Sequence, residues 1–343
     1  MKVWTIAPVL VLFLIMAAAL QSLPRLAAEQ SLACKTCHIN PNGGGARTEF
    51  GNHSVAFHEL TLQKTKKYFE KKFRSPRISE SVLVGFDSRY RVQEGGRVFR
   101  LQTDAYLTFE PYQDLMYHLR FWENGTSEQY MLLYLNQQKY YLKIGRFYPA
   151  YGLRMADFDT FVRSQLGFSY NAYIDGVSLG AKIGGSNIAV EIFNPNQQFV
   201  GAFHIFRTGY VKSLSFLAGF SARISEQQNG SNGAFPHTKG IFGGLSYDRF
   251  TLLGELDLAG KANDSLLFYA GLTTRIEYGL YLIAEYNFFD DDRDLKSGVN
   301  EFLRFSLEFY PIPFVQFRPS YTYYTNGPQV GEDNFFLQFH VGY

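Results

Sequence analysis

Apolar and polar side chains alternate with a period of two from about Ser81 to the last residue of this chain. Between Leu280 and Phe288, for example, every second residue is apolar, and Glu285 and Asn287 lie at positions between them. Successive side chains of a strand point to opposite faces, so the pattern predicts strands with one apolar face. About sixteen such segments can be counted. They span residues 82–93, 97–110, 114–123, 129–136, 139–147, 173–184, 187–193, 199–210, 213–225, 238–247, 250–259, 265–276, 279–289, 299–310, 314–325 and 333–343.

The connections between these segments alternate in length. Residues 137–138 and 185–186 form short connections, whereas residues 148–172 form a connection long enough to fold inward and narrow a pore. Short turns at one end and long loops at the other are typical of transmembrane barrels. We therefore predict an all-β fold, a transmembrane antiparallel β-barrel of about 16 strands with a range of about 12–16. A soluble β-sandwich is the alternative, but it does not explain the alternation or the aromatic last residue, Tyr343.

The first residues have the order of a secretory signal peptide. Lys2 precedes an apolar run from Val3 to Leu20, and the small residues Ala27 and Ala28 follow it. We predict a signal peptide over residues 1–28, with an uncleaved helical anchor as the alternative. Export and a barrel together indicate the outer membrane of a bacterium. The net charge is +2, so nothing in the overall charge balance indicates nucleic-acid binding.

The sequence Cys34-Lys-Thr-Cys37-His38 holds both cysteines of the chain. This spacing is typical of covalent haem c attachment, in which two thioethers hold the porphyrin and the histidine ligates the iron. Cys34 and Cys37 are thus the predicted attachment residues and His38 is the predicted proximal ligand. A disulfide, a thioredoxin-like redox pair and half of a zinc site are the alternatives. Zinc would require further Cys or His residues at ligand spacing.

Residues 29–75 differ in character from the rest, and we predict that they form a small α-helical haem c segment before a barrel over residues 76–343. Gly43, Gly44 and Gly45 would let the backbone pass close to a bulky group. A helix is expected from Ser54 to about Lys72. Its end is basic, and it would contact solvent, anionic lipid headgroups or an acidic periplasmic electron carrier.

The iron of a haem held by His38 can take one more protein ligand. His53 and His58 are the histidines nearest to His38, and either would give bis-histidine ligation. The alternative is a five-coordinate iron with both histidines on a polar helix surface. Met116 or His118 would serve only if the haem segment entered the barrel lumen.

Two further patterns are weaker. Asp290, Asp291 and Asp292 lie in a predicted outer loop and offer hard oxygen ligands to a cation, although such a run also makes a loop soluble. Gly176-Val-Ser178-Leu-Gly180 matches a hydrolase nucleophile motif but lies inside a predicted strand, without the strand-to-helix turn that the motif needs. No residue set supports bond-making catalysis.

A single Cys-x-x-Cys-His unit, followed by Asn-Pro-Asn-Gly-Gly-Gly-Ala-Arg47 and then by a barrel, resembles the fused monohaem cytochrome c–porins of bacterial outer membranes. The segment from Gly145 to Arg154 also resembles a strand–loop stretch of haem-bearing barrels. The likeness covers nearly all of the mature chain, while the residues flanking the haem motif and the shorter barrel differ from the iron-oxidising type.

The resemblance implies electron transfer between the periplasm and the cell exterior through one covalent haem c, with extracellular iron or another metal as a substrate. Its implied partners are outer-membrane lipid, a periplasmic electron carrier or cytochrome, and an extracellular metal ion. The haem segment would lie in the periplasm or in the barrel lumen. The alternatives are a transport or binding porin whose haem unit acts as a redox sensor or a structural plug, and an oxidoreductase that acts on a metal or a small molecule at the outer loops.

Overall fold

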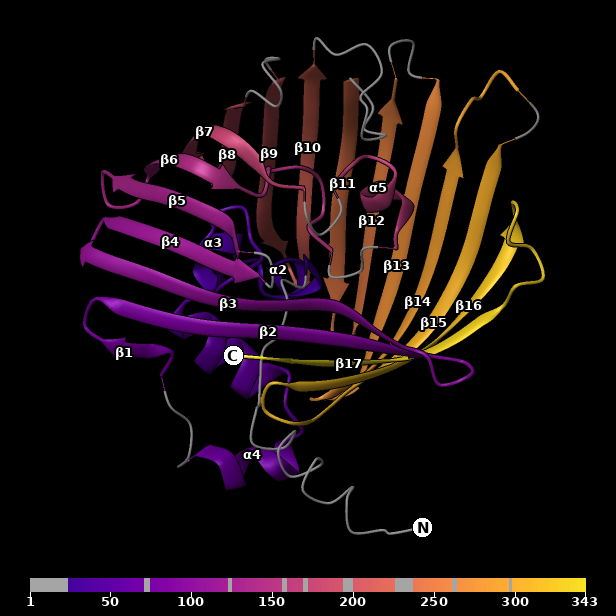
Figure 1. The fold of residues 1–343 in the computed structure, drawn as a ribbon, viewed down its shortest axis with the longest axis horizontal. Helices are drawn as coiled ribbons and strands as arrows, with labels where there is room; N and C mark the ends of the chain where they lie inside the picture. Colours follow the sequence, from indigo (N-terminus) through magenta and orange to yellow (C-terminus); the bar gives the residue numbers. More distant parts are fainter. Residues whose placement is uncertain are drawn as a thin grey trace.

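The computed structural model describes residues 24–70, 75–122, 125–155, 159–168, 172–193, 200–225, 237–260, 264–295 and 298–343. Within them, sixteen long strands, β2 to β17, follow one another around a barrel (Figure 1). The strands are β2 Val82–Gln93, β3 Val98–Tyr112, β4 Leu115–Trp122, β5 Gly125–Leu135, β6 Tyr140–Phe147, β7 Ile174–Ile183, β8 Ser186–Phe193, β9 Val200–Val211, β10 Leu214–Ser225, β11 His237–Tyr247, β12 Phe250–Ala259, β13 Ser265–Glu277, β14 Leu280–Asp290, β15 Val299–Ile312, β16 Val315–Asn326 and β17 Asn334–Gly342.

The barrel is closed by its first and last long strands. Strand β17 pairs antiparallel with β2, from Phe336 opposite Gln93 to Gly342 opposite Asp87. Every other neighbouring pair in the barrel is also antiparallel and consecutive in sequence. The predicted all-β antiparallel barrel of sixteen strands is therefore confirmed. The sequence pattern did not predict the short strand β1, Arg77–Ser79, which pairs with β2.

The barrel wall has apolar residues outside and polar residues inside. On β8, the side chains of Val190 and Ile192 are 43 % and 57 % exposed, whereas Glu191 between them is 1 % exposed. The same arrangement, with charged side chains buried on the inner face, occurs around the wall, for example at Asp104, Glu255 and Arg318. A buried charge is costly unless it is paired, so the lumen needs partners for these groups.

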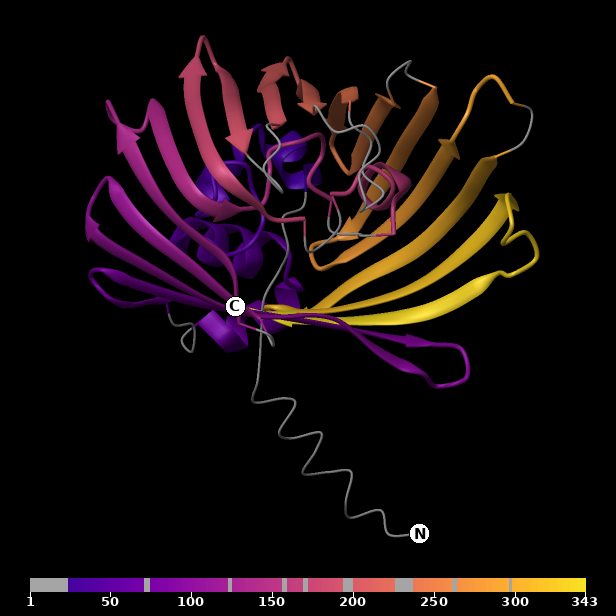
Figure 2. The ribbon, with the colours of Figure 1, turned by 45° about the horizontal axis from the view of Figure 1, so that its top comes forward.

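The N-terminal segment supplies some of these partners from inside the barrel. Its helices are α2 Pro24–Gln30, α3 Cys34–Cys37, the π-helix η2 Gly51–Glu59 and α4 Gln63–Glu70. Figures 1 and 2 show α2 and α3 within the ring of strands, and α4 beyond its edge. No helix of the described part of the chain is both long and apolar enough to cross a membrane.

The prediction of a single helix from Ser54 to Lys72 is wrong, because the helical structure is interrupted between Glu59, where η2 ends, and Gln63, where α4 begins. Leu60 is buried, and the backbone N–H of Leu62 donates to the carbonyl of Tyr310 in the wall (3.2 Å). The chain therefore anchors to the barrel rim at this point instead of continuing the helix. Lys71, Lys72 and Arg74, at the predicted basic end, lie outside the described residues.

The N-terminal segment sits at the end of the barrel that carries the short turns. Lys35 donates to the carbonyl of Gln138 in the turn between β5 and β6 (2.7 Å), and the Thr65 hydroxyl donates to the carbonyl of Pro311 beside another short turn (2.6 Å). Arg25 forms a buried ion pair with Glu308 (2.7 Å). The predicted signal-peptide boundary at Ala28 falls inside α2, while residues 1–23 lie outside the described residues.

The connection between β6 and β7 folds into the lumen, as its length predicted. Its short helix α5, Phe161–Ser164, contacts β12, β13 and β14 (Figure 1). Wall side chains accept hydrogen bonds from its backbone: Glu191 from Ala150 (2.8 Å) and Glu255 from Leu153 (2.8 Å). We call residues 148–173 the inner loop. Within it, residues 156–158 and 169–171 are outside the described part.

Arg163 holds the inner loop to the wall through a buried ion pair with Glu255 (3.1 Å). We expect Arg163→Ala to destabilise the loop by about 3–5 kcal/mol, because Glu255 would be left buried without its cation. Faster proteolysis within the inner loop and a lower urea midpoint would measure this.

The matched control is Arg146→Ala, which breaks the exposed pair with Asp175 (2.7 Å) on β6 and β7. An exposed pair contributes at most about 1 kcal/mol. Equal sensitivity of the two variants would contradict the assigned role of Arg163.

Candidate functional site

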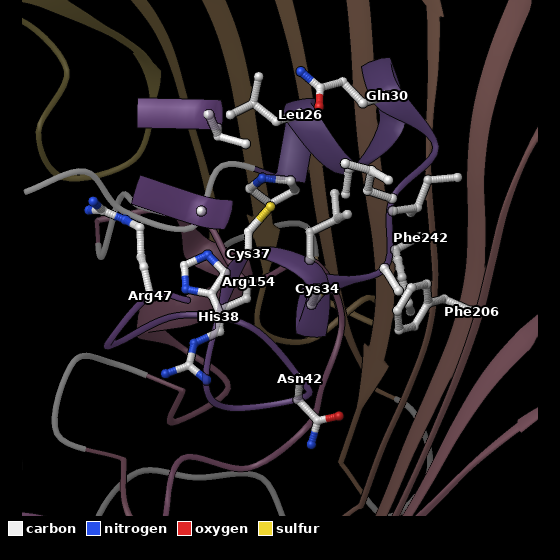
Figure 3. Close-up of a pocket in the computed structure, with 18 of the residues that line it drawn as sticks. Leu26, Gln30, Cys34, Cys37, His38, Asn42, Arg47, Arg154, Phe206 and Phe242 are labelled. Carbon is white, nitrogen blue, oxygen red and sulfur yellow. The ribbon is translucent and has the colours of Figure 1, made fainter. Parts of the chain in front are cut away.

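A cavity lies inside the barrel where the N-terminal segment, the inner loop and the wall meet (Figure 3). Cys34, Cys37 and His38 line it from the N-terminal segment, Arg154 from the inner loop, and Phe206 from β9. The space between the lining atoms is about 810 Å³, its open mouth included. Cofactor pockets are mostly apolar with a few placed polar groups, and the lining of this cavity has that composition.

The local fold presents both sulfur atoms on one side. Cys34 and Cys37 begin and end the helical turn α3, and residues three apart lie on the same face of a helix. The backbone N–H of His38 donates to the carbonyl of Cys34 (3.0 Å), which fixes the start of the following chain. Both cysteines are free thiols, so the predicted alternative of a disulfide is not formed here.

The chain after His38 makes a tight loop and returns beside it. His38 pairs with Arg47 in an isolated antiparallel bridge, and the N–H of Ile39 donates to the carbonyl of Ala46 (3.0 Å). Gly43, Gly44 and Gly45, at the turn, all have positive φ, which favours glycine. A Cβ on Gly44 would overlap the Arg154 side chain, so this arginine is a bulky group that the glycine accommodates.

His38 is buried and uncharged. Burial, together with the nearby guanidinium groups of Arg47 and Arg154, lowers the pKa of His38 to about 3. Its Nδ1 atom has no hydrogen-bond partner among the described residues. A neutral imidazole is the form that ligates a metal ion.

Two arginines that line the cavity lack a carboxylate partner. Arg47 donates to the side-chain oxygen of Asn52 (2.9 Å), and burial lowers the pKa of Arg47 to about 10. Arg154 lies over the ring of Tyr148 (4.0 Å), and its buried Nη1 has no hydrogen-bond partner in the described part of the chain. Other buried arginines of the lumen do pair with carboxylates: Arg25 with Glu308, Arg120 with Asp104, Arg163 with Glu255 and Arg318 with Glu285.

The structure does not bring the other predicted ligands to this cavity. His53 and His58 lie on η2, with their rings 4.8 Å apart, and neither lines it. His118 faces the lumen elsewhere and bonds to Thr108 (2.9 Å), and Met116 packs against two separate apolar clusters.

Asp290 ends β14, and Asp291 and Asp292 begin the connection that follows it. The side chain of Asp290 accepts a hydrogen bond from the backbone of Asp292 (3.2 Å). No group of three or more possible ligands able to hold a metal occurs among the described residues.

Sequence reasoning missed one histidine at the cavity. His204 on β9 lines it together with His38, and its side chain is 6 % exposed. The alternation along β9 gives His204 an inward direction, but this property is shared by every polar lumen residue. Its place beside the haem motif depends on how deeply the N-terminal segment enters the barrel.

Comparison with known proteins gives structural matches only. No protein-family model matches the sequence, and no curated protein matches it significantly. OmpT of Vibrio cholerae is 12 % identical, with a TM-score of 0.55 over 78 % of this chain and 99 % of that chain. OprB of Pseudomonas putida, in its low-pH structure, is 9 % identical, with a TM-score of 0.57 over 82 % of this chain and 96 % of that chain. OmpF of Salmonella typhi is 11 % identical, with a TM-score of 0.52 over 76 % of this chain and 97 % of that chain.

The fold is a porin-like barrel. At these identities the likeness concerns the fold alone. The function of the cavity must therefore be argued from its own residues.

Gly51 keeps η2 against the cysteine turn, because a Cβ there would overlap the carbonyl group of Cys37. Overpacking of this kind costs about 1–3 kcal/mol. In protein produced without haem, we expect Gly51→Ala to loosen the segment and to raise the rate at which Cys34 and Cys37 react with a maleimide by about tenfold.

Gly201→Ala is the control, since nothing lies within 4 Å of a Cβ at that position. Its labelling rate should equal that of the original chain. An unchanged rate in Gly51→Ala as well would show that the segment tolerates the added group.

Proposed function

We propose that this chain is an outer-membrane cytochrome–porin, which carries one covalently attached haem c in its lumen and passes electrons between the periplasm and the cell exterior. The observation that carries the proposal is the meeting of Cys34, Cys37 and His38, in one lumen cavity, with two guanidinium groups that form no direct ion pair with a described carboxylate. Extracellular ferrous iron, or another reduced metal, is the proposed outer reactant.

The residues at the cavity fit a haem. Cys34 and Cys37 would carry the thioether bonds, and the neutral His38 would ligate the iron. Arg47 and Arg154 would pair with the propionates, because both line the cavity and neither forms a direct ion pair with a carboxylate of the described residues. Leu153 and Phe206 contribute to the apolar part of the lining, which would exclude water from the ring.

When bound, haem c would supply a one-electron iron couple, and the protein would set its reduction potential. The proximal histidine and burial in an apolar cavity are two of the features by which a protein sets that potential. The N-terminal segment and the inner loop exclude solvent from the cavity and orient His38.

The depth of the cavity favours a role in transfer across the membrane. The apolar band of an outer-membrane barrel is about 25 Å tall, so a single haem outside the barrel could not bridge it. The motif lies on a segment held inside the wall, where Asn40 accepts a hydrogen bond from Lys143 (3.3 Å) and Asn42 donates to Glu191 (3.3 Å). A haem attached there would lie inside the barrel, so an electron leaving it would have less than the full thickness of the membrane to cross.

The outward face supports the proposed location. The exposed apolar side chains on the wall, such as Ile192 and Leu256, alternate with buried charges, as expected of a barrel surrounded by lipid. The short-turn end corresponds to the periplasmic end of such barrels, which would direct Lys64 and Lys67 of α4 toward a periplasmic electron carrier.

Haem attachment is tested by the double variant Cys34→Ser/Cys37→Ser. We expect haem-stained protein in the outer-membrane fraction of cells that make the original chain, and no stained band with the variant, because both thioether bonds are lost. Thr36→Ala, in the same motif, should keep the stain. An unstained original chain, in cells that attach haem to other proteins, would refute the proposal.

Electron transfer is tested in liposomes that contain the protein and an enclosed redox dye. External ferrous iron should reduce the dye with the original chain, and His38→Ala should lower the initial rate at least tenfold, because the iron loses its proximal ligand. Escape of the dye is followed in parallel with an impermeant quencher.

A transport porin with a structural haem plug is the second candidate, favoured by the ion pairs that fix the segment to the wall, such as Arg25 with Glu308. It predicts solute passage with no dependence of dye reduction on His38. That result would refute electron transfer across the membrane but would not contradict the barrel fold or the attachment of haem.

A further inference from the structure

We propose that His204, on strand β9 of the barrel wall, is the second axial ligand of the haem iron. This inference rests on the proposed function and assigns the iron a ligand from the barrel itself. The haem would then be held from two sides, by the covalent motif of the N-terminal segment and by the wall.

His204 shares the cavity with the predicted proximal ligand. All seven histidines of the chain lie in the described residues, and His38 and His204 are the two that line the cavity. No methionine of the described part of the chain lines it. In the view of Figure 3, Cys34 lies between His38 and the side of the cavity formed by Phe206 and Phe242, the aromatic neighbours of His204.

Hydrogen bonding leaves one ring nitrogen of His204 available. Its Nδ1 lies 2.8 Å from the hydroxyl oxygen of Ser221, and the N–H of Gly152 in the inner loop donates to the same oxygen (2.9 Å). With the proton on Nδ1, Ser221 accepts from both groups and the lone pair is on Nε2. Metal-ligating histidines characteristically donate their other ring N–H in this way.

The Nε2 atom of His204 forms no hydrogen bond with any described residue. The side chain is nevertheless 94 % buried, since its exposed fraction is 6 %. A ring nitrogen without a protein partner, on a residue that lines the cavity, is available to a ligand bound there.

The aromatic neighbours hold the ring in place. The imidazole stacks on Phe242, with ring centroids 5.2 Å apart and planes 3° from parallel, and the Phe206 ring lies 5.5 Å away. A ring fixed by stacking and by a hydrogen bond is already oriented before a ligand binds, which lowers the cost of binding. His53, in contrast, is exposed on η2.

The test uses haem-loaded protein purified from outer membranes in detergent. Absorption, resonance Raman and electron paramagnetic resonance spectra should show six-coordinate low-spin iron in the original chain. His204→Gly should convert it to the high-spin form, and added imidazole should restore the low-spin spectrum by occupying the space of the missing ring. The double variant His53→Ala/His58→Ala should retain the original spectrum.

A second variant covers the case in which His204→Gly does not fold, as judged by its heat-dependent migration on gels. His204→Met keeps a ligating side chain of similar volume, and histidine–methionine ligation should raise the reduction potential. Low-spin spectra that survive in both His204 variants with an unchanged potential would overturn the inference, as would a five-coordinate original protein. Original protein without any haem would instead refute the proposed function.

Discussion

The structure depends on the pairing of charges inside the barrel. Because the outward positions of the strands are apolar, the inward positions carry charged side chains that the wall buries. Neighbouring strands satisfy some of them, as in the pair of Arg120 on β4 with Asp104 on β3. Others have partners from outside the wall: Glu308 pairs with Arg25 of the N-terminal segment, and Glu255 pairs with Arg163 of the inner loop. The two inserted segments are therefore part of the electrostatic structure of the barrel, since their removal would leave buried carboxylates unpaired.

The same requirement identifies the site. Around the lumen, arginines meet carboxylates, but the pattern stops at the cavity, where Arg47 and Arg154 have no carboxylate within ion-pair distance in the described part of the chain. Asp87 stabilises the charge of Arg47 and Glu128 that of Arg154, but neither carboxylate forms a direct ion pair with its arginine, so the compensation is partial. A dianionic ligand beside Cys34 and Cys37 would supply direct pairs. The fold and the haem motif thus indicate the same cavity for independent physical reasons.

The strands were predictable from the sequence because their pattern is local. A period of two, interrupted by turns, gave the bounds of β2 and β12 without error and those of the other strands within a few residues. The N-terminal segment was harder, because its structure is set by contacts with residues far along the chain. The helix is interrupted after Glu59, where Leu62 bonds to Tyr310, and Arg154 lies against Gly44 although the two residues are about a hundred positions apart. A local helix pattern predicts neither of these contacts. For the same reason the motif could be assigned from its spacing, whereas the inward-facing His204 could not be distinguished from other lumen residues.

The position of His204 links the candidate site to the inner loop. Ser221 is the common partner: its hydroxyl group bonds to the imidazole of His204 and accepts from the backbone N–H of Gly152. Leu153, the next residue, donates to Glu255, which is also the partner of Arg163. The orientation of one imidazole is thereby joined, through a serine and two loop residues, to the ion pair that holds the loop. A displacement of the loop would remove the N–H that helps to fix Ser221, and the ring of His204 would lose part of the support that fixes its orientation. In such an arrangement the inner loop also positions a residue at the cavity, so a displacement of the loop would change both access through the lumen and the environment of the candidate site.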